Sequence, residues 1–415
     1  MKASQSLLVL IVGNVAGLPH PGQREPTCQH VSLNVSTNVW KTYSLYPNPV
    51  YKAQVLSAAQ TIQDPILKKK AFKVAEVGSF LWMCVTWPPS SLRNLYGSSL
   101  NSPSRPRNNA TAISTIDAFV ADVPCDRVIG IVLQGLDTGY CSAPRFRTVE
   151  AETYRKEFIN PLATLLTSHP STAFALILEP ETLPIMVLNS DLSTCKPLAT
   201  SYRTNVAYAL QTLNLPNVVI YLDAGHGGNL GWESNLAPAA SELAAVYSAA
   251  GRPSQLRGFA VNIGGWNAWD LSPGEFDTTR EAPRNRAQNE MRFVALLGRL
   301  LGENGTPNHA VMDTSRNGVP GLRYEWGDWC NVDGAGFGRF PSAEGTGLEL
   351  ADAFIWAKGG GVSDGTSDAS AVSYDAFCGK LGAFKPSPEK GEWNQAYFEM
   401  LLENAHPYIR VDTIP

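Results

Sequence analysis

Short apolar runs alternate with longer stretches of helical character along most of this chain, and this alternation limits the possible folds more than any other feature. Seven runs rich in Val, Ile, Leu and Phe are candidate strands, at 78–85, 127–133, 172–178, 217–222, 256–261, 309–312 and 351–356. Stretches with helical spacing or propensity lie between them, at 51–75, 114–123, 149–168, 198–213, 238–250 and 288–301. Strands that alternate with helices of this length predict an α/β fold, with a parallel sheet covered by helices.

The chain length allows two or three average domains or one large α/β barrel. The sequence has 415 residues, and no Pro/Gly/Ser-rich linker separates the seven units. We therefore expect a single domain, a closed or nearly closed barrel over 51–415, preceded by an extended N-terminal arm at 18–50. A Gly/Ser/Asp-rich loop at 357–392 is long for a compact domain, and loops of that length are usually functional.

The N-terminus carries the pattern of a secretory signal peptide. A short charged start at Met1-Lys2 precedes an apolar run over 7–15 and the small residues Ala16-Gly17, which predicts a signal peptide over 1–17. The alternative is a first core helix. No later apolar run reaches the roughly 18 residues of a membrane span. Three glycosylation sequons lie in polar surroundings, at Asn34, Asn109 and Asn304. We expect a secreted, extracellular glycoprotein with disulfide bonds.

The charge of the chain argues against polyanionic partners. Charged residues make up only 17% of the sequence and the formal net charge is -4, so there is no basic patch for nucleic acid or for an anionic membrane. The chain also holds 10 Trp, 14 Tyr and 15 Phe. A weakly charged chain rich in aromatic residues suits a neutral ligand.

Polar side chains follow the predicted strands where each apolar run stops. In α/β barrels the ligand lies at the carboxyl ends of the strands. The polar residues at these ends include Cys84, Gln134, Glu179, Glu181, Asp223, His226, Asn262, Asp313, Arg316, Lys358 and Asp364. Tryptophans fall at or just after the same ends, at Trp82, Trp87, Trp232, Trp266, Trp269, Trp326 and Trp329. Any one strand must end in polar residues, and any one Trp can belong to the core. Together, these residues predict a cleft in which indoles stack on the apolar faces of sugar rings.

Two groups of motifs carry a resemblance to a known family. The first is Asn214-Leu215-Pro216-Asn217 through Tyr221-Leu222-Asp223-Ala224-Gly225-His226, with Leu230-Gly231-Trp232. The second is Trp326-Gly327-Asp328-Trp329-Cys330-Asn331-Val332, with 336–338, 364–368 and 394–398. They resemble glycoside hydrolase family 6, the cellobiohydrolase II and endoglucanase family, over about 39–407. The resemblance implies a distorted seven-stranded TIM-like (β/α) barrel, a β-1,4-glucan such as cellulose or a cello-oligosaccharide as substrate, and hydrolysis with inversion.

Inversion requires two carboxyl groups, an acid that protonates the leaving oxygen and a base that deprotonates a water. The family places its acid as Asp in a Glu-Pro-Asp sequence, which here reads Glu179-Pro180-Glu181, so the resemblance implies Glu181 as acid with one extra methylene. Asp364 is the candidate base. The second family aspartate, which helps to keep the acid protonated, is replaced by Tyr140, and a tyrosine carries no such charge near neutral pH. Asp137 is the nearest substitute.

The resemblance also implies substrate-binding positions and two disulfides. The substrate-binding positions are Trp82, Gln134, Asp223, His226, Trp232, Asn262, Trp326 and Lys358, and the implied disulfides are Cys141–Cys195 and Cys330–Cys378. Four further positions depart from the family pattern, with Gln134 for a tyrosine, Asn229 for a tryptophan, Cys84 for an aspartate and Val362 for a glutamate. The cysteines Cys28, Cys84 and Cys125 stay unassigned. Cys84 and Cys125 fall at opposite ends of neighbouring parallel strands, which disfavours a bond between them.

Three hypotheses for function remain open. The chain is a secreted β-1,4-glucanase with altered activity, a non-hydrolytic glucan-binding relative on the same barrel, or a hydrolase of another neutral plant polysaccharide. None of them requires a cofactor, and no metal-binding spacing is present in the sequence. We expect a monomer that binds neither nucleic acid nor membranes.

Overall fold

The computed structural model describes residues 28–84, 109–136, 141, 149–275, 277 and 279–411. The predicted signal peptide, Asp137, Tyr140 and Trp87 lie outside these residues. In the described part of the chain, no helix combines the length and the apolar composition that crossing a membrane requires.

The sheet is parallel throughout and follows chain order from β3 to β8. Its strands are β1 (Ser44–Leu45), β2 (Leu81–Cys84), β3 (Arg127–Gln134), β4 (Ala173–Leu178), β5 (Val218–Asp223), β6 (Leu256–Val261), β7 (His309–Asp313) and β8 (Ala351–Ile355). Both β1 and β2 pair with β3, at different heights along it, and the register places Cys84 opposite Gln134. The seven predicted strands are β2 to β8, and β1 is an additional short strand.

The barrel closes only partly between β2 and β8. No ladder of strand pairs joins these two strands in the described part of the chain. Instead the Phe80 amide donates to the Trp356 carbonyl at 2.9 Å, and Trp82 Nε1 donates to the Ala357 carbonyl at 2.6 Å. The result is a nearly closed seven-stranded barrel, which confirms the predicted fold.

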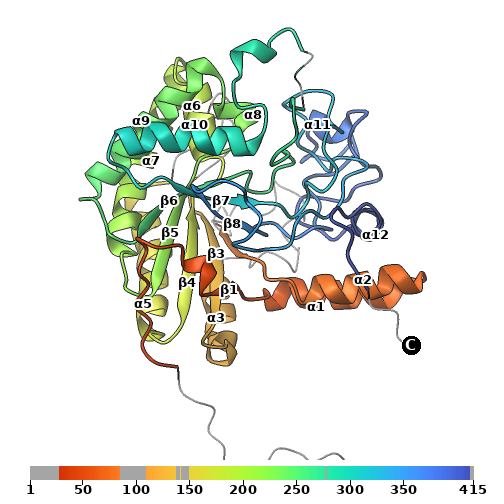
Figure 1. Ribbon diagram of the computed structural model, residues 1–415, viewed down its shortest axis with the longest axis horizontal. Coiled ribbons are helices and arrows are strands. Elements are labelled where there is room, and N and C mark those ends of the chain that lie inside the picture. The colour runs from red at the N-terminus through yellow and green to blue at the C-terminus, as the bar shows by residue number, and fades with distance from the viewer. Residues whose placement is uncertain are drawn as a thin grey trace, which may run out of the picture.

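Helices cover the outside of the barrel (Figure 1). The long ones are α1 (Pro49–Thr61), α2 (Pro65–Ala75), α3 (Asn109–Phe119), α5 (Asn160–Ser168), α7 (Lys196–Thr212), α9 (Glu233–Ala249), α10 (Glu290–Glu303) and α12 (Gln395–Glu403). Shorter ones include α4 (Ala151–Thr153), a π-helical turn η4 (Tyr154–Ile159), α6 (Thr182–Leu188), α8 (Gly227–Leu230) and α11 (Ala376–Gly379). The 3₁₀ turns of the described residues are η1 (Val39–Lys41), η3 (Val120–Asp122), η5 (Ser193–Cys195) and η6 (Ala282–Arg284).

The helical stretch predicted at 51–75 is two helices. Asp64 caps the second one, because its carboxylate accepts from the amides of Ile66 and Leu67 at 2.7 and 2.8 Å. Pro65 occupies the first helical position, where its missing N–H is no loss. This local chemistry breaks the pattern, so α1 and α2 form a hairpin that packs against α12.

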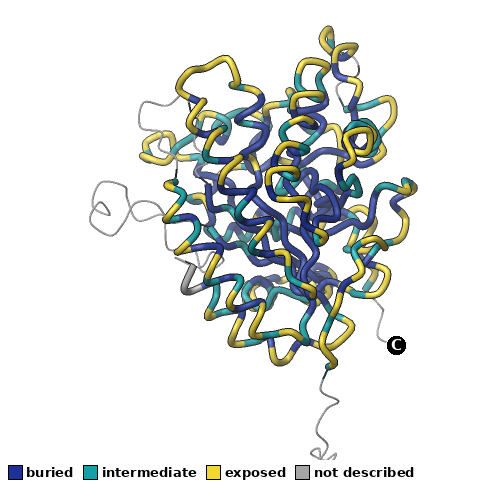
Figure 2. Tube along the Cα trace, turned by 90° about the vertical axis from the view of Figure 1, so that its left-hand side faces the viewer, coloured by how far each residue is buried: buried dark blue, intermediate teal, exposed yellow. Residues whose placement is uncertain are grey.

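The buried residues of the described chain form three clusters. The strands run through the interior, and the outer turns of the helices are exposed (Figure 2). The largest lies between the sheet and the helices, and a second fills the barrel with Val132, Ile177, Tyr221 and other strand residues. A third joins α1, α2 and α12 to the loops after β7 and β8. The sheet is therefore held on both faces, and its carboxyl edge is a rigid base for side chains.

Three disulfides join elements that are distant in sequence. Cys141–Cys195 and Cys330–Cys378 are both present, as the family resemblance implied. The third is Cys28–Cys125, with a Cα–Cα distance of 5.5 Å. Cys84 takes part in none of the three, consistent with the expectation against a Cys84–Cys125 bond.

Candidate active site

The predicted site residues within the described chain come from the carboxyl edge of the barrel or from the loops that follow it. Trp82 and Gln134 belong to the ends of β2 and β3, and Asp223 ends β5. Lys358 and Asp364 follow β8. Because parallel strands share one carboxyl edge, residues separated by almost 300 positions in sequence lie at the same edge.

The chain turns sharply after β4, at Glu179-Pro180-Glu181. Both glutamates adopt a left-handed backbone, with φ of 55° for Glu179 and 70° for Glu181. Such conformations cost about 1–3 kcal/mol each and are typical of functional sites. The two side chains differ completely in environment, since Glu179 is buried and Glu181 is exposed. The same tight turn therefore hides one carboxyl group and presents the other.

Glu179 holds the end of β3 in place. Its carboxylate accepts from the main-chain amides of Gly135 and Leu136, at 3.0 and 2.8 Å, and from the Tyr154 hydroxyl at 2.8 Å. Burial raises the pKa of Glu179 to about 7, even though these hydrogen bonds act in the opposite direction. The role is structural, and the sequence analysis named Glu179 only as a polar residue at a strand end.

Asp223 lies beside the same turn. Its Oδ2 accepts from the main-chain amides of Gly225 at 3.0 Å and Glu181 at 3.1 Å. Burial raises the pKa of Asp223 to about 8, with a further contribution from the nearby Glu181 carboxylate. Asp223 is therefore protonated, and neutral, over most of the range in which Glu and Asp are normally ionised.

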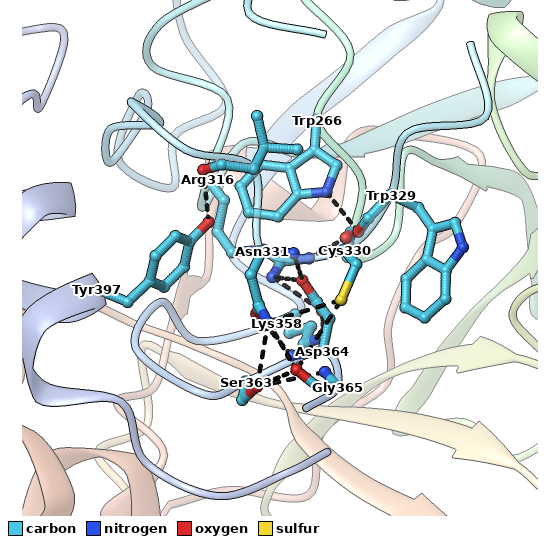
Figure 3. A network of polar contacts seen from close by, with 12 residues as sticks. Trp266, Arg316, Trp329, Cys330, Asn331, Lys358, Ser363, Asp364, Gly365 and Tyr397 are labelled. Carbon is cyan, nitrogen blue, oxygen red and sulfur yellow. Dashed lines mark hydrogen bonds and ion pairs between the residues drawn. The ribbon is translucent and has the colours of Figure 1, made fainter. Parts of the chain in front are cut away.

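Asp364 is in the opposite electrostatic situation (Figure 3). Arg316 Nη1 donates to both oxygens of Asp364, at 3.0 and 2.9 Å. Lys358 Nζ pairs with Oδ1, and the main-chain amide of Asn331 donates to Oδ2 at 2.9 Å. Burial alone would raise its pKa, but the two cations and the hydrogen bonds outweigh burial and lower the pKa to about 2. Asp364 is a permanent anion at the carboxyl edge.

The guanidinium beside Asp364 is itself fixed on an indole. Arg316 is fully buried, and its guanidinium carbon lies 3.9 Å from the ring centroid of Trp266. Trp266 Nε1 in turn donates to the Trp329 carbonyl at 3.0 Å, next to the Cys330–Cys378 disulfide. Figure 3 shows Trp266 above Arg316, with Asp364 on the other side. The position of the anion is thus set by stacked, cross-linked loops.

Two indoles, one from the loop after β5 and one from the loop after β7, form an aromatic corner. The rings of Trp232 and Trp326 meet edge to face, with centroids 6.3 Å apart and an interplanar angle of 73°. Trp232 Nε1 donates to the Gly228 carbonyl at 2.8 Å. A Cβ added to Gly228 would lie 2.5 Å from the Trp326 ring, so only glycine fits there. Both indoles are half-buried, which leaves part of each ring accessible.

A small hollow lies at the gap between β2 and β8. It is lined by Trp82, Lys358, Val362 and Tyr51 among others. The Tyr51 hydroxyl donates to the Gly360 carbonyl at 3.0 Å and so fixes the loop that carries Lys358. Cys84 and Gln134 lie beside each other at the same edge, with Sγ 3.7 Å from Oε1. The family resemblance implies charged or aromatic side chains at the positions of Cys84, Gln134 and Val362.

Asn262 is buried among the loops that follow β6 and β7. Its side chain is fully buried, its Nδ2 donates to the Asp313 main-chain carbonyl at 2.9 Å, and its Oδ1 accepts from the main-chain amide of Asn267 at 3.0 Å. Asn262 therefore supports these loops, and its contact with a substrate stays a prediction. Sequence reasoning identified a polar strand end correctly but had no means to tell which way the side chain is used.

Several residues around the site had no role in the sequence-based prediction. Asn267, Glu275, Glu290 and Arg323 form a buried polar network behind His226. Their spacing is irregular and they come from separate loops and α10, so no local pattern marks them. Asn331 lies within the family motif that begins at Trp326, but its contact with Asp364 depends on the fold. Tyr140, named as the replacement for the partner of the acid, lies outside the described residues.

Comparison with known proteins gives a consistent result. The family model for glycosyl hydrolases family 6 matches residues 40–405. The 1,4-beta-D-glucan cellobiohydrolase CEL6C of Podospora anserina is 49% identical over 418 residues, covering 98% of this chain and 99% of the relative. The solved CcCel6A catalytic domain complexed with p-nitrophenyl β-D-cellotrioside is 34% identical, with a TM-score of 0.77, covering 90% of this chain and 99% of that one. Cellobiohydrolase II (Cel6A) of Humicola insolens, in complex with glucose and cellotetraose, is 34% identical with a TM-score of 0.75, covering 90% and 100%.

Proposed function

Because the chain belongs to glycosyl hydrolase family 6, we propose that it hydrolyses β-1,4-linked glucan with inversion, and that Glu181 and Asp364 are its acid and base. The proposal rests on the contrast between the two carboxyl groups at one edge of the barrel. Glu181 is exposed on a strained turn, whereas Asp364 is a buried anion held by two cations. Relatives that carry the names of cellobiohydrolases, and a relative in complex with cellotetraose, support β-1,4-glucan as the substrate class.

The reaction requires a proton on the acid before the bond breaks. Glu181 gives this proton to the glycosidic oxygen, and the leaving sugar departs as an alcohol. A water then attacks the anomeric carbon from the opposite face, and its proton passes to Asp364. One water is consumed, and exchange with solvent returns both carboxyl groups to their starting states. Asp364 is a weak base, because Arg316 and Lys358 stabilise its anionic form.

Asp223 does not take over the role of the second family aspartate. Burial raises the pKa of Asp223 to about 8, so below that pH it is protonated and places no negative charge beside Glu181. Its Oδ2 instead accepts from the main-chain amide of Glu181 at 3.1 Å and so fixes the turn that carries the acid.

The tryptophans supply the binding surface. Trp232, in the loop after β5, and Trp326, in the loop after β7, present half-exposed indoles, and Trp82 lies at the gap between β2 and β8. Sugar rings have apolar faces that stack on indoles. Asn229, where the family has a tryptophan, uses its side chain to accept from the His226 amide at 2.9 Å, so it shapes the loop and offers no platform. We expect weaker binding of the sugar at that end of the cleft than in relatives with the indole.

The test is the release of reducing ends from soluble cello-oligosaccharides by the wild-type chain and by Glu181→Gln. The wild type is expected to hydrolyse them. The side-chain amide of the Glu181→Gln variant is not acidic enough to protonate the leaving oxygen, so the rate should fall by at least about 100-fold while affinity is retained. Exposed Glu233→Gln, near the same edge, is a matched control and is expected to keep full activity. Binding without hydrolysis by the wild type would instead identify a glucan-binding relative. Hydrolysis of another neutral polysaccharide in preference to β-1,4-glucan would identify that polysaccharide, instead of β-1,4-glucan, as the substrate.

We also propose that the protein is secreted and acts as a monomer outside the cell. Three disulfides are typical of chains that fold in an oxidising compartment, and the N-terminal pattern predicts a signal peptide. Expression in a secreting host, followed by intact mass and sizing of the protein in the medium, tests this proposal. The expected product begins after residue 17 and elutes at the monomer mass.

A further inference from the structure

His226 lies between the binding surface and a buried polar network. It precedes α8 and is half-buried, and a Cβ on Gly228 would touch both its ring and the ring of Trp326. Its Nδ1 lies 3.2 Å from Nδ2 of Asn267. Within the part of the chain that the structure describes, no hydrogen bond is made by the other ring nitrogen, Nε2. One edge of the imidazole therefore faces the protein and the other is available to a ligand.

The orientation of the Asn267 amide follows from a neighbour that can only donate. Its Oδ1 accepts from Arg323 Nη2, and a guanidinium has no acceptor. Arg323 is itself fixed by Glu275, with Nε and Nη2 at 3.1 and 2.7 Å from the two carboxylate oxygens, and both side chains are almost fully buried. The assignment of the side-chain oxygen and nitrogen of Asn267 therefore follows from the hydrogen-bond chemistry of Arg323.

Both hydrogens of the Asn267 amide nitrogen have acceptors. One points to Glu290 Oε1, which also accepts from the Gly227 amide at 2.8 Å. Burial raises the pKa of Glu290 to about 7, and when this carboxyl is protonated the proton belongs on Oε2, which makes no hydrogen bond among the described residues. Oε1 is an acceptor in either state. The second hydrogen of Asn267 is left for His226 Nδ1, so Nδ1 must present its lone pair.

We propose that Asn267 is a positioning residue of the glucan site, and that its amide holds His226 as the neutral tautomer with the proton on Nε2. The ring then presents a hydrogen-bond donor to the binding surface, suited to a sugar hydroxyl or ring oxygen. Burial, with a contribution from Arg323, also lowers the pKa of His226 to about 3, so the ring stays neutral in mild acid. The ligand part of this proposal rests on the proposed function, whereas the tautomer part does not.

The tautomer is read directly from the nitrogen chemical shifts of the imidazole, in protein labelled with ¹⁵N at histidine. The chain has six His, and the signals of His226 are those that disappear in His226→Gln. In the wild type we expect Nε2 to show the shift of a protonated nitrogen and Nδ1 that of a bare one. The opposite pattern, or a charged ring at pH 6, would overturn the proposal.

Asn267→Asp reverses the hydrogen-bond requirement without changing the shape of the side chain. One carboxylate oxygen keeps the Arg323 contact, and the other can only accept from the two groups that the amide nitrogen contacts. Glu290 must then hold its proton on Oε1, and His226 must carry a proton on Nδ1. The expected spectrum therefore moves the proton to Nδ1. Asn317→Ala is the matched control, because it removes a 2.8 Å hydrogen bond to the main-chain oxygen of Asn267 and leaves the amide in place. Movement of the proton in the control, or none in Asn267→Asp, would contradict the proposal; if Asn267→Asp does not fold, the wild-type spectrum decides.

Affinity for cellotetraose, measured by calorimetry in the Glu181→Gln background, tests the role of the donor. Loss of one hydrogen bond predicts roughly three- to tenfold weaker binding for Asn267→Asp and a change of less than about twofold for Asn317→Ala. Equal affinity in Asn267→Asp would overturn the donor role. Absence of binding in the background chain would count against the proposed function, while the nitrogen shifts would still decide the tautomer.

Discussion

Replacement of Asp223 by Asn should remove part of the pH dependence of folding. The burial of Asp223 raises its pKa to about 8, whereas an Asp in the unfolded chain titrates near 3.9. Between these two values the folded state holds one proton more than the unfolded state. The free energy of unfolding therefore has its full value below about pH 4 and falls as the pH rises toward 8.

The magnitude follows from the width of the window. Each pH unit in which the two states differ by one proton changes the free energy of unfolding by about 1.4 kcal/mol. Between pH 5 and pH 7 this one carboxyl group should thus lower the stability of the wild type by about 2.7 kcal/mol. Asn mimics the protonated acid, since its oxygen can still accept from the amides of Gly225 and Glu181. In Asp223→Asn, that portion of the pH dependence should be absent.

The assay is urea unfolding of both proteins at pH 5, 6 and 7, with the disulfides intact. Glu179 and Glu290 also have raised pKa values and contribute their own slopes, so the quantity to compare is the difference between wild type and variant at each pH. The exposed Asp191→Asn is the control and should follow the wild type. A difference that stays constant within about 0.5 kcal/mol from pH 5 to pH 7 would show that Asp223 is ionised in the folded protein and would refute the reasoning.

Three further perturbations have definite outcomes. Lys358→Met removes one of the two cations beside Asp364, so the pKa of Asp364 should rise by about 1–3 units and the acid limb of the kcat/KM profile should move to higher pH; an unmoved limb would exclude Asp364 as the base. Loss of the Cys330–Cys378 bond, which spans 48 residues, should lower the free energy of unfolding in urea by up to about 4 kcal/mol, and a loss below 1 kcal/mol would contradict this expectation. Trp326→Ala should weaken cellotetraose binding about tenfold in calorimetry, because roughly 50 Å² of apolar contact contributes about 1.3 kcal/mol, and equal affinity would exclude stacking on this indole.

The fold was accessible from the sequence because its signals are local and repeated. Each strand is an apolar run that ends in a polar residue, and seven repetitions of one unit leave few alternatives to a barrel. The short helix α6 was missed because its seven residues follow directly on the turn at Glu181, within what reads as a loop. The break between α1 and α2 had a signal, Asp64-Pro65, that the helical pattern on both sides concealed.

The site was accessible only in part, because the chemistry of each group depends on its surroundings. The sequence identifies Glu181, Asp223 and Asp364 as acidic residues at strand ends. The sequence alone does not show that the first is exposed, the second protonated and the third anionic. Arg316 and burial make that difference, and both arise from contacts across more than 40 residues. The contacts of Asn267 likewise join α10 to separate loops, so only the folded chain reveals them.

The order of the disulfides has a consequence for how the chain acquires them. The three bonds join 28 to 125, 141 to 195 and 330 to 378, so each loop ends before the next one begins. A chain that emerges N-terminus first into an oxidising compartment can therefore complete each bond before the next pair arrives. Cys84 is the exception, because it emerges between Cys28 and Cys125 and can capture Cys28 first. Cys84→Ser should then increase the yield of correctly bonded protein, and the wild type should need a disulfide isomerase more than the variant does.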